Sequence, residues 1–455
     1  METKHLTILL ITVLLAQAFP MDVLGLDEVD SNFLKYEVGE VFVGELRHVI
    51  QIINPWQNAA TGKLVVPLVN NRTSYHYTVL YNFSAEGGRF SSSRFLNDSF
   101  RNVYLCWENV EIPPRKNFTI ELDYFVISFS VRYMVNPSLV GSYDVNSELY
   151  RRYIEPEKLI QSDNPEIVRT AQTIVGDEEN PHKKAVLIYA FVTKHLKYEV
   201  QSEEKGALWA LENRKGDCSE YSYLFVALCR AVGIPARVQA GFAFHYVNEV
   251  IENGHMWAEY YLENYGWIPA DATWKMFDQI DYRHVSSIQS IPEVMPYANF
   301  HFESAGGRRL EDKQRIQLKR VSTSKFSDSQ FAEKIMAAIQ MVKQAEFGAS
   351  IGKILGVKFL FPSEIDNVEH KILECKVYIQ NAVDAWSESS QIATGNAAEA
   401  IKIAEEAYKH YWMLIAKVFT LYFIIALVLI AISLALSRRS SRKLVPSISH
   451  IASLS

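Results

Sequence analysis

Three side chains in the central part of the sequence could together form an activated thiol nucleophile. Cys218 stands in KGDCSEYS, just before the apolar run LFVALCRAV, while His255 opens HMWAEYYL and Asp271 follows GWIPA. A thiol nucleophile needs a base that takes its proton, and the base needs a group that orients it. Cysteine, histidine and aspartate can supply these three roles. The alternative for Cys218 is a small apolar residue tucked under a helix.

The elements predicted around these residues would bring them together. A helix is predicted over 218–232, so the thiol would lie where free N–H groups and the helix dipole favour a thiolate. The segments ARVQAGFAFHY, HMWAEYYL and YGWIPADATW are predicted strands. Pairing of the last two would place His255 and Asp271 side by side, about 5 Å apart. The backbone N–H of Cys218 could contribute to an oxyanion hole.

Other residues compete for these roles. His245 is the rival base, but it lies in FAFHY, and a hydrogen-bonded strand histidine is the favoured interpretation. Asp278 and Asp281 are rivals of Asp271. Arg237 ends a turn before a strand, and we predict a buried ion pair or packing contact there rather than a substrate clamp.

The other three cysteines are predicted to be structural. Cys229 lies about 16 Å along the same helix from Cys218, so the two cannot bond while the helix is intact. Cys106 is predicted to lie in the core of a strand. Cys375 is predicted to be a buried thiol, with an interchain disulfide as the alternative. No CxxC or HExxH spacing occurs, so we predict no metal site.

The sequence around the three chemical residues resembles the transglutaminase-like superfamily. The match is close over residues 207–275 and looser from residue 160. The motifs that carry it are Gly216-Asp-Cys218, Arg230-Ala-Val-Gly-Ile-Pro-Ala-Arg237, His255-Met-Trp257-Ala-Glu259-Tyr-Tyr261, Gly266-Trp267 and Asp271-Ala-Thr273.

The resemblance implies a papain-like core at residues 155–300. In it Cys218 is the nucleophile, His255 the general base and acid, and Asp271 the orienting group. Family members form an acyl-thioenzyme that an amine or water resolves, and no cofactor or metal is implied. Members cross-link glutamine to lysine, cleave peptides, or remove glycans from asparagine. The flanking segments look most like those of microbial membrane-anchored members.

An antiparallel β-sandwich is predicted over residues 28–140. KLVVPLV, YHYTVLYNF and FTIELDYFVISFSVRY are alternating apolar runs separated by turn clusters such as AEGG. Four sequons fall in this region and predict a glycosylated surface, although they could be clustered by chance. Their asparagines are Asn71, Asn82, Asn97 and Asn117.

The two ends of the chain predict a single-pass type I membrane protein. Residues 1–18 have the layout of a secretory signal peptide, with an uncleaved anchor as the alternative. Residues 418–436 carry no charge and could cross about 30 Å of hydrocarbon; a buried core helix is the alternative. Four basic residues follow at 438–443, so residues 437–455 are predicted to be a cytoplasmic tail.

A helical, membrane-proximal stalk is predicted over residues 325–417. It contains an a/d heptad seam that could pair within one chain, which is favoured, or between two chains as a homo-oligomer. Gly395 is predicted to break the helical pattern. The seam residues are Ile365, Val368, Ile372, Cys375, Ile379, Ala382 and Trp386.

Together these patterns predict an α+β fold with several parts. A papain-like transglutaminase core follows an antiparallel β-sandwich and precedes a helical stalk and one transmembrane helix. The net charge of -6 gives no case for nucleic acid, and four cysteines are too few for a disulfide scaffold.

The predicted function is that of an extracytoplasmic enzyme acting on amide bonds of proteins or peptides. Hydrolysis is slightly favoured over amine transfer, because nothing marks an amine-acceptor or calcium site. Two alternatives stay open. The ectodomain could be a non-catalytic adhesion or scaffold module, or it could remove glycans in the manner of a peptide N-glycanase.

Overall fold

The computed structural model describes residues 33–69, 73, 75–296, 298–307, 309–321, 329–386 and 388–442. The predicted signal peptide, Asn71 and most of the predicted tail lie outside these residues. The chain divides into two compact units. The described residues of the larger unit are those up to 339 and those at 376–397, and those of the smaller unit lie at 340–375 and 398–442.

The larger unit contains a β domain made of two antiparallel sheets. Its strands are β1 (Tyr36–Ile53), β2 (Ala60–Pro67), β3 (His76–Glu86), β4 (Ser92–Asn97), β5 (Val103–Ile112), β6 (Asn117–Tyr133), β10 (Val250–Ile251), β14 (Gln279–Ile280), β16 (His301–Ser304) and β17 (Glu311–Arg320). The first sheet has the order β10-β17-β1-β6-β14, with β3 also paired to β6. The second has the order β16-β2-β5-β4.

Alternation of apolar and polar residues makes these strands form two packed layers. Along β6, Phe118, Ile120 and Leu122 point into the core, and β1 contributes Phe42 and Leu46 to the same core. Side chains on successive positions of a strand point to opposite faces, so the residues between them face outward.

The β domain is discontinuous in sequence. β17 pairs with β1 from Gly44↔Arg320 to Ile53↔Glu311, and β16 pairs with β2. The sequence analysis predicts no helix or strand between residues 300 and 325. The chain therefore leaves this domain after β6 and returns to complete both sheets.

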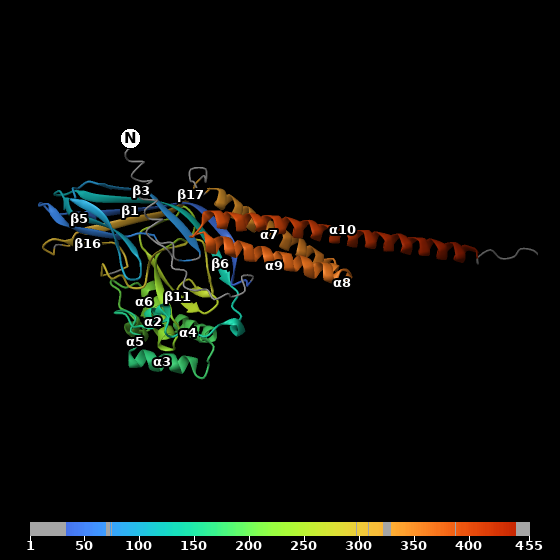
Figure 1. Cartoon of the computed structure of the whole chain (residues 1–455), viewed down its shortest axis with the longest axis horizontal. Helices are drawn as coiled ribbons and strands as arrows, with labels where there is room; N and C mark the ends of the chain where they lie inside the picture. Colours follow the sequence, from blue (N-terminus) through green and yellow to red (C-terminus); the bar gives the residue numbers. More distant parts are fainter. Residues whose placement is uncertain are drawn as a thin grey trace, which may run out of the picture. The chain divides into compact units, whose positions relative to one another are not determined.

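The segment between these strands forms an α+β domain, as the sequence predicts. Its elements, which follow the short helix η1 (Pro137–Leu139), are α2 (Glu148–Ile154), α3 (Pro165–Val175), α4 (Pro181–His195), β7 (Lys197–Tyr198), α5 (Ala207–Asn213), β8 (Lys215–Gly216), α6 (Cys218–Ala231), β9 (Ala236–Ala243), β11 (His255–Leu262), β12 (Gly266–Asp271), β13 (Met276–Phe277) and β15 (His284–Gln289). Figure 1 shows helices α2 to α6 on one side of the larger unit and the β domain on the other.

The central helix of this domain packs against an antiparallel sheet. The sheet has the order β13-β12-β11-β9-β15, and α6 contacts β9 and β11 on one side and α3, α4 and α5 on the other. The helix caps agree with the sequence. Asn164 and Asn180 accept backbone N–H groups at the starts of α3 and α4, and Gly176 caps the end of α3 with a positive φ.

The α+β domain and the β domain share one apolar core. Phe242, Phe244 and Val285 belong to the same buried cluster as the inner residues of β1 and β6. A polar contact adds to this packing, because the hydroxyl of Tyr75 donates to Glu259 and accepts the indole N–H of Trp257. The sheet that carries His255 is therefore supported by the β domain.

The carboxyl-terminal part of the described chain is helical. Its helices are α7 (Ser329–Ile354), α8 (Val357–Leu360), α9 (Pro362–Ala385) and α10 (Ser390–Arg442). All seven side chains of the predicted seam are buried within the chain, as the favoured intrachain alternative requires. The predicted break at Gly395 is wrong, because α10 runs through it and the helix boundary lies between Ala385 and Ser390.

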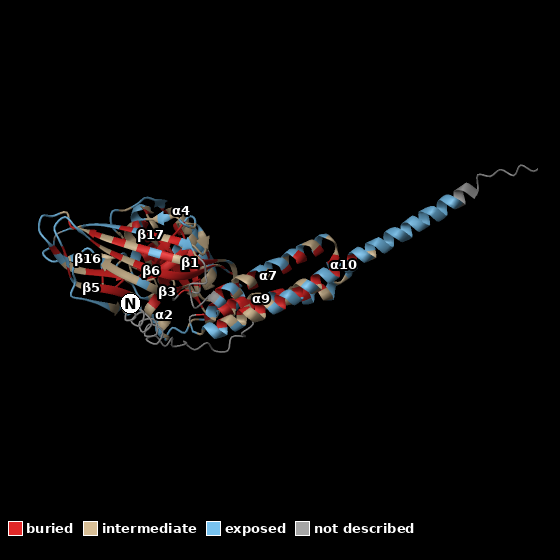
Figure 2. Ribbon diagram, turned by 90° about the horizontal axis from the view of Figure 1, so that it is seen from above, coloured by how far each residue is buried: buried red, intermediate tan, exposed pale blue. Residues whose placement is uncertain are grey.

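The last part of α10 is long and apolar enough to cross a membrane. Only 6% of its most apolar 18-residue window is buried, and every side chain from Tyr422 to Leu436 is exposed. Figure 2 shows this part of the helix in the colour of exposed residues. Such exposure contradicts the buried-core alternative, since a core helix would bury these side chains.

Candidate functional site

Cys218 is the first residue of α6, as predicted. Asp217 is the N-cap, and its Oδ1 accepts hydrogen bonds from the backbone N–H and the hydroxyl of Ser219. Glu220 completes a capping box by accepting the backbone N–H of Asp217 at 3.0 Å. The N–H of Cys218 has no acceptor within the helix, because the first turn of any α-helix leaves its donors free.

The segment before α5 is tied to this helix terminus. Asp217 Oδ2 accepts the N–H of Gln201, and Glu220 Oε1 accepts the N–H of Lys205. Packing requires glycine at Gly216, since a Cβ there would lie 2.3 Å from the Cβ of Glu220. The backbone on both sides of the thiol is thus fixed by hydrogen bonds.

His255 and Asp271 are hydrogen-bonded, with 2.6 Å between Nε2 and Oδ2. They are placed diagonally across β11 and β12 rather than directly opposite. The register pairs Ala258 with Ala270, so Asp271 comes level with Trp257. An imidazole is long enough to span a diagonal strand pair.

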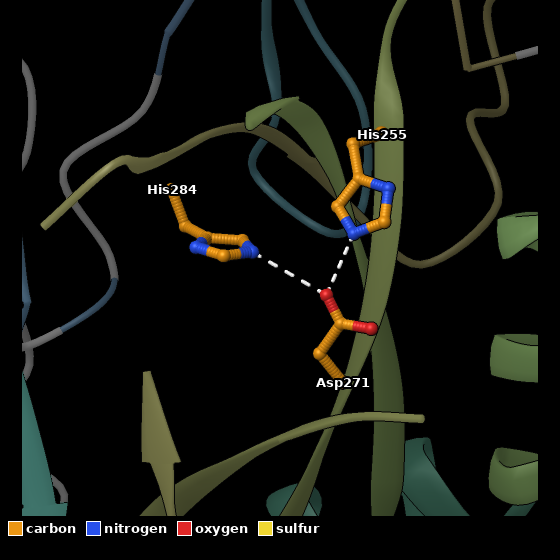
Figure 3. Close-up of side chains that lie close together, drawn as sticks. All are labelled: His255, Asp271 and His284. Carbon is orange, nitrogen blue, oxygen red and sulfur yellow. Dashed lines mark hydrogen bonds and ion pairs between the residues drawn. The ribbon is translucent and has the colours of Figure 1, made fainter. Parts of the chain in front are cut away.

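The carboxylate of Asp271 is buried and accepts five hydrogen bonds. Oδ1 accepts the N–H and hydroxyl of Thr273 and the N–H of Trp274. Oδ2 accepts from His255 and, at 3.3 Å, from Nε2 of His284 (Figure 3). Burial by itself would raise the pKa of Asp271, but the two imidazoles outweigh it and hold the pKa well below its usual range.

His255 is held in its protonated state by its partners. Burial alone would lower its pKa, but the charge of Asp271 and hydrogen bonds to Asp271 and Cys218 raise the pKa to about 9. Since Nε2 is taken by Asp271, Nδ1 is the ring nitrogen left for the Cys218 thiol. An imidazolium at this position favours a neighbouring thiolate.

This pKa predicts the alkaline limit of the reactivity of Cys218. The shift is upward, so the imidazolium persists below about pH 9 and is lost as the pH rises through that value. Iodoacetate carries a negative charge that the imidazolium attracts, so its rate of alkylation of Cys218 should fall above about pH 9. Mass spectrometry of the Cys218 peptide measures this rate. A fall already complete near pH 7 would contradict the arrangement.

Cys218 and His255 line a cleft of about 200 Å³. Its walls include Gly241 of β9 and the two β-domain residues His48 and Pro67. Gly241 allows close strand packing, since a Cβ there would lie 2.1 Å from a carbonyl oxygen of β15. The β domain therefore forms part of the wall beside the thiol.

Two of the rival residues, His245 and Asp278, have partners of their own outside the Cys218–His255–Asp271 group. His245 is exposed and faces Glu249, while Asp278 pairs with His182 at 2.8 Å. Arg237 is buried against Glu259 at 2.7 Å, which confirms the predicted ion pair.

His284 is the site residue that the sequence analysis missed. Its ring is fully buried at the start of β15, with Nδ1 2.9 Å from Oδ1 of Asp281 and Nε2 facing Asp271. The sequence presents Asp281 only as a rival of Asp271. No motif surrounds His284, and its position three residues after Asp281 is the only signal in the sequence.

His255, Asp271 and His284 also offer three metal-ligand atoms within 4.8 Å of one another. A cation there would need both Nε2 atoms deprotonated, whereas hydrogen bonding to Asp271 raises the pKa of each imidazole. It would also separate His255 from Asp271. The arrangement therefore fits a hydrogen-bonded cluster better than a metal centre.

The remaining cysteines are buried free thiols. Burial raises the pKa of Cys106 to about 11 and that of Cys375 to about 12, and it raises the pKa of Cys229 as well. Cys218 is the half-buried cysteine of the four.

Three of the four sequon asparagines are described, and all three are exposed on the β domain: Asn82, Asn97 and Asn117. Their exposure allows modification, and glycosylation stays a prediction.

Part of the chain matches a known protein family. Residues 168–272, which include Cys218, His255 and Asp271, match the family model described as the transglutaminase-like superfamily. This segment is a transglutaminase-like domain. An uncharacterized protein from Haemophilus influenzae is 33% identical over 123 residues. That match covers 22% of this chain and spans about a third of the relative's length.

Two solved structures are loosely similar to this chain. One is described as a candidate cysteine protease from Cytophaga hutchinsonii, with 16% identity over 62% of this chain and 100% of that one, at a TM-score of 0.43. The other is the periplasmic domain of TgpA from Pseudomonas aeruginosa bound to ethylmercury, with 17% identity over 51% and 91%, at a TM-score of 0.28. No conclusion about this chain follows from TM-scores this low.

Proposed function

We propose that the protein is a membrane-anchored cysteine enzyme that acts on amide bonds of extracytoplasmic proteins or peptides. The observation that carries the proposal is the Cys218–His255–Asp271 arrangement in a cleft, with the thiol at a helix N-terminus and the carboxylate buried. Hydrolysis is favoured over transfer to an amine, because no motif in the sequence marks an amine-acceptor site.

In the proposed first step the thiolate of Cys218 attacks the carbonyl carbon of the substrate amide. The oxygen becomes an oxyanion, which the free N–H of Cys218 can stabilise. His255 then gives its Nδ1 proton to the leaving nitrogen, and the C–N bond breaks. An amine or ammonia leaves, and the acyl group stays on Sγ as a thioester.

In the second step the neutral His255 takes a proton from water. The resulting hydroxide attacks the thioester carbonyl, the C–S bond breaks, and a carboxylic acid leaves. The thiolate and imidazolium are regenerated. Throughout, Asp271 keeps the ring oriented and stabilises its protonated form.

Membrane anchoring is supported by the exposed apolar part of α10. The basic residues at 438–443, which would remain in the cytoplasm, support the proposed type I topology. A carboxyl-terminal tag on the full chain should then react with antibody only after cells are permeabilised. Labelling of that tag on intact cells would overturn this topology. Self-association through the helical region stays a proposal.

The nature of the products tests the proposed reaction. The full chain in detergent micelles is incubated with peptides, glycopeptides and a labelled primary amine, and the products are identified by mass spectrometry. Hydrolysis gives new carboxylic acids, transfer incorporates the amine, and deglycosylation releases free glycan. Absence of any product that depends on Cys218 would overturn the enzyme proposal in favour of a scaffold.

A further inference from the structure

Asp271 has two histidine partners, although a Cys-His-Asp arrangement needs only one. His255 Nε2 and His284 Nε2 both face Oδ2, at 2.6 and 3.3 Å, and both rings are visible around the carboxylate in Figure 3. The His255 and His284 ring centres are 5.7 Å apart. The second histidine is therefore part of the immediate surroundings of the proposed base.

The second ring is fixed from its other side as well. Its Nδ1 faces Oδ1 of Asp281 at 2.9 Å, and Asp281 is itself held by the guanidinium of Arg283. A neutral imidazole has one N–H and can donate to only one carboxylate. Because both ring nitrogens of His284 face carboxylates, the geometry corresponds to a doubly protonated imidazolium.

Besides the two carboxylates and His255, uncharged rings surround His284 in the described part of the chain. The indoles of Trp257 and Trp274 pack edge-on against its ring, at centroid distances of 5.3 and 4.9 Å. His76 of β3 lies behind β15 and accepts the backbone N–H of Ser286. Burial lowers the pKa of His76 to about 3, so it is neutral.

We propose that His284 is a positioning residue, which fixes the Asp271 carboxylate for His255 and places a buried positive charge beside the Cys218–His255 pair. The charges then alternate from Asp281 through His284, Asp271 and His255 to the thiolate of Cys218. This inference rests on the proposed use of Cys218 as nucleophile. His284 itself touches neither the thiol nor the substrate cleft.

The charge has a measurable consequence at acidic pH. Burial tends to lower the pKa of His284, but Asp271 and Asp281 outweigh it and raise the pKa to about 8. The ring is therefore charged below about pH 8. A nearby positive charge favours a thiolate over a neutral thiol. Removing the charge should move the onset of thiolate reactivity to higher pH.

The test is the pH profile of Cys218 alkylation by iodoacetate in the full chain in detergent micelles. His284→Gln keeps an N–H group that can donate to Asp271 but has no charge. Its acid limb, the rise of the alkylation rate with increasing pH, should therefore lie about one pH unit above that of the unmodified protein. His284→Phe should show the same shift and a plateau rate about tenfold lower, because nothing then holds Asp271 from that side. A plateau rate that is higher in His284→Gln than in His284→Phe shows that the hydrogen bond to Asp271 matters, and not packing alone.

His182→Gln is the matched control, since it breaks the His–carboxylate pair of similar length with Asp278. It should leave the acid limb in place. The proposal is overturned if folded His284→Gln keeps the acid limb of the unmodified protein, or if His182→Gln moves it equally. Thermal unfolding identifies variants that are not folded, and His284→Gln carries the test if His284→Phe is one of them.

Alkylation needs no substrate, so this result stands apart from the proposed reaction. If Cys218→Ala retains amide-bond turnover, the proposed function fails whatever the profile shows. If that variant is inactive and the profiles coincide, only the role of His284 fails.

Discussion

Cys218→Ala should lower the rate of amide-bond turnover by a factor on the order of 10⁴ or more. The other three thiols are buried and held neutral by raised pKa values, so none can replace it. Alanine leaves the cap made by Asp217 and Glu220 intact, and the fold should therefore persist. The measurement is kcat/KM for a peptide substrate identified by the product analysis, with thermal unfolding as a check of folding.

Cys229→Ala is the matched control for this variant. Both thiols lie on α6, but Cys229 is fully buried and lies outside the cleft. Its replacement should cost roughly 1 kcal/mol of stability by leaving a small cavity, while turnover stays nearly unchanged. Equal loss of turnover in both variants would show that the first effect came from the helix and not from the thiol.

Asp271→Asn should lower kcat/KM by about 10³-fold or more. Asparagine has nearly the same shape, but it is neutral and has only one acceptor oxygen for the donors that now surround the carboxylate. Without the negative charge the pKa of His255 should fall, since only Cys218 then opposes the effect of burial. The alkaline limb, the fall of the Cys218 alkylation rate with increasing pH, should therefore move from about pH 9 to a lower pH.

Asp278→Asn provides the comparison for a half-buried carboxylate outside the cleft. Asp278 accepts hydrogen bonds from His182 and from Tyr260, so its loss should reduce stability. The alkaline limb should not move, because Asp278 does not contact His255. An unchanged limb in Asp271→Asn would remove the basis for assigning Asp271 the orienting role.

The local sequence was sufficient to locate Cys218, His255 and Asp271. Each lies at the end of an element that its own segment specifies: an N-cap before an apolar helix for the thiol, and short alternating runs for the two strands. Helix caps and strand alternation depend on residues within a few positions, so they can be predicted without knowing the rest of the fold. The diagonal placement of His255 and Asp271 could not be predicted from local sequence, because it depends on the pairing register of the two strands.

The completion of the β domain could not be predicted in the same way. β17 shows alternation only at Gln314, Ile316 and Leu318, and most of its other residues are charged. Its partner β1 lies more than two hundred residues earlier in the chain, and pairing at that separation leaves no local pattern. The same holds for the β-domain residues that form the cleft wall.

The sequence by itself determined the chemical residues, the helix on which the thiol lies and the apolar segment at the end of α10. Hydrophobic periodicity, capping and motif spacing are local properties, and they are present in the unfolded chain. Only the tertiary structure decided that Asp271 is shared between His255 and His284, and that Asp281 fixes the second ring. The reason is physical: these hydrogen bonds join β11, β12 and the start of β15, and the bonding groups meet only after the sheet has formed.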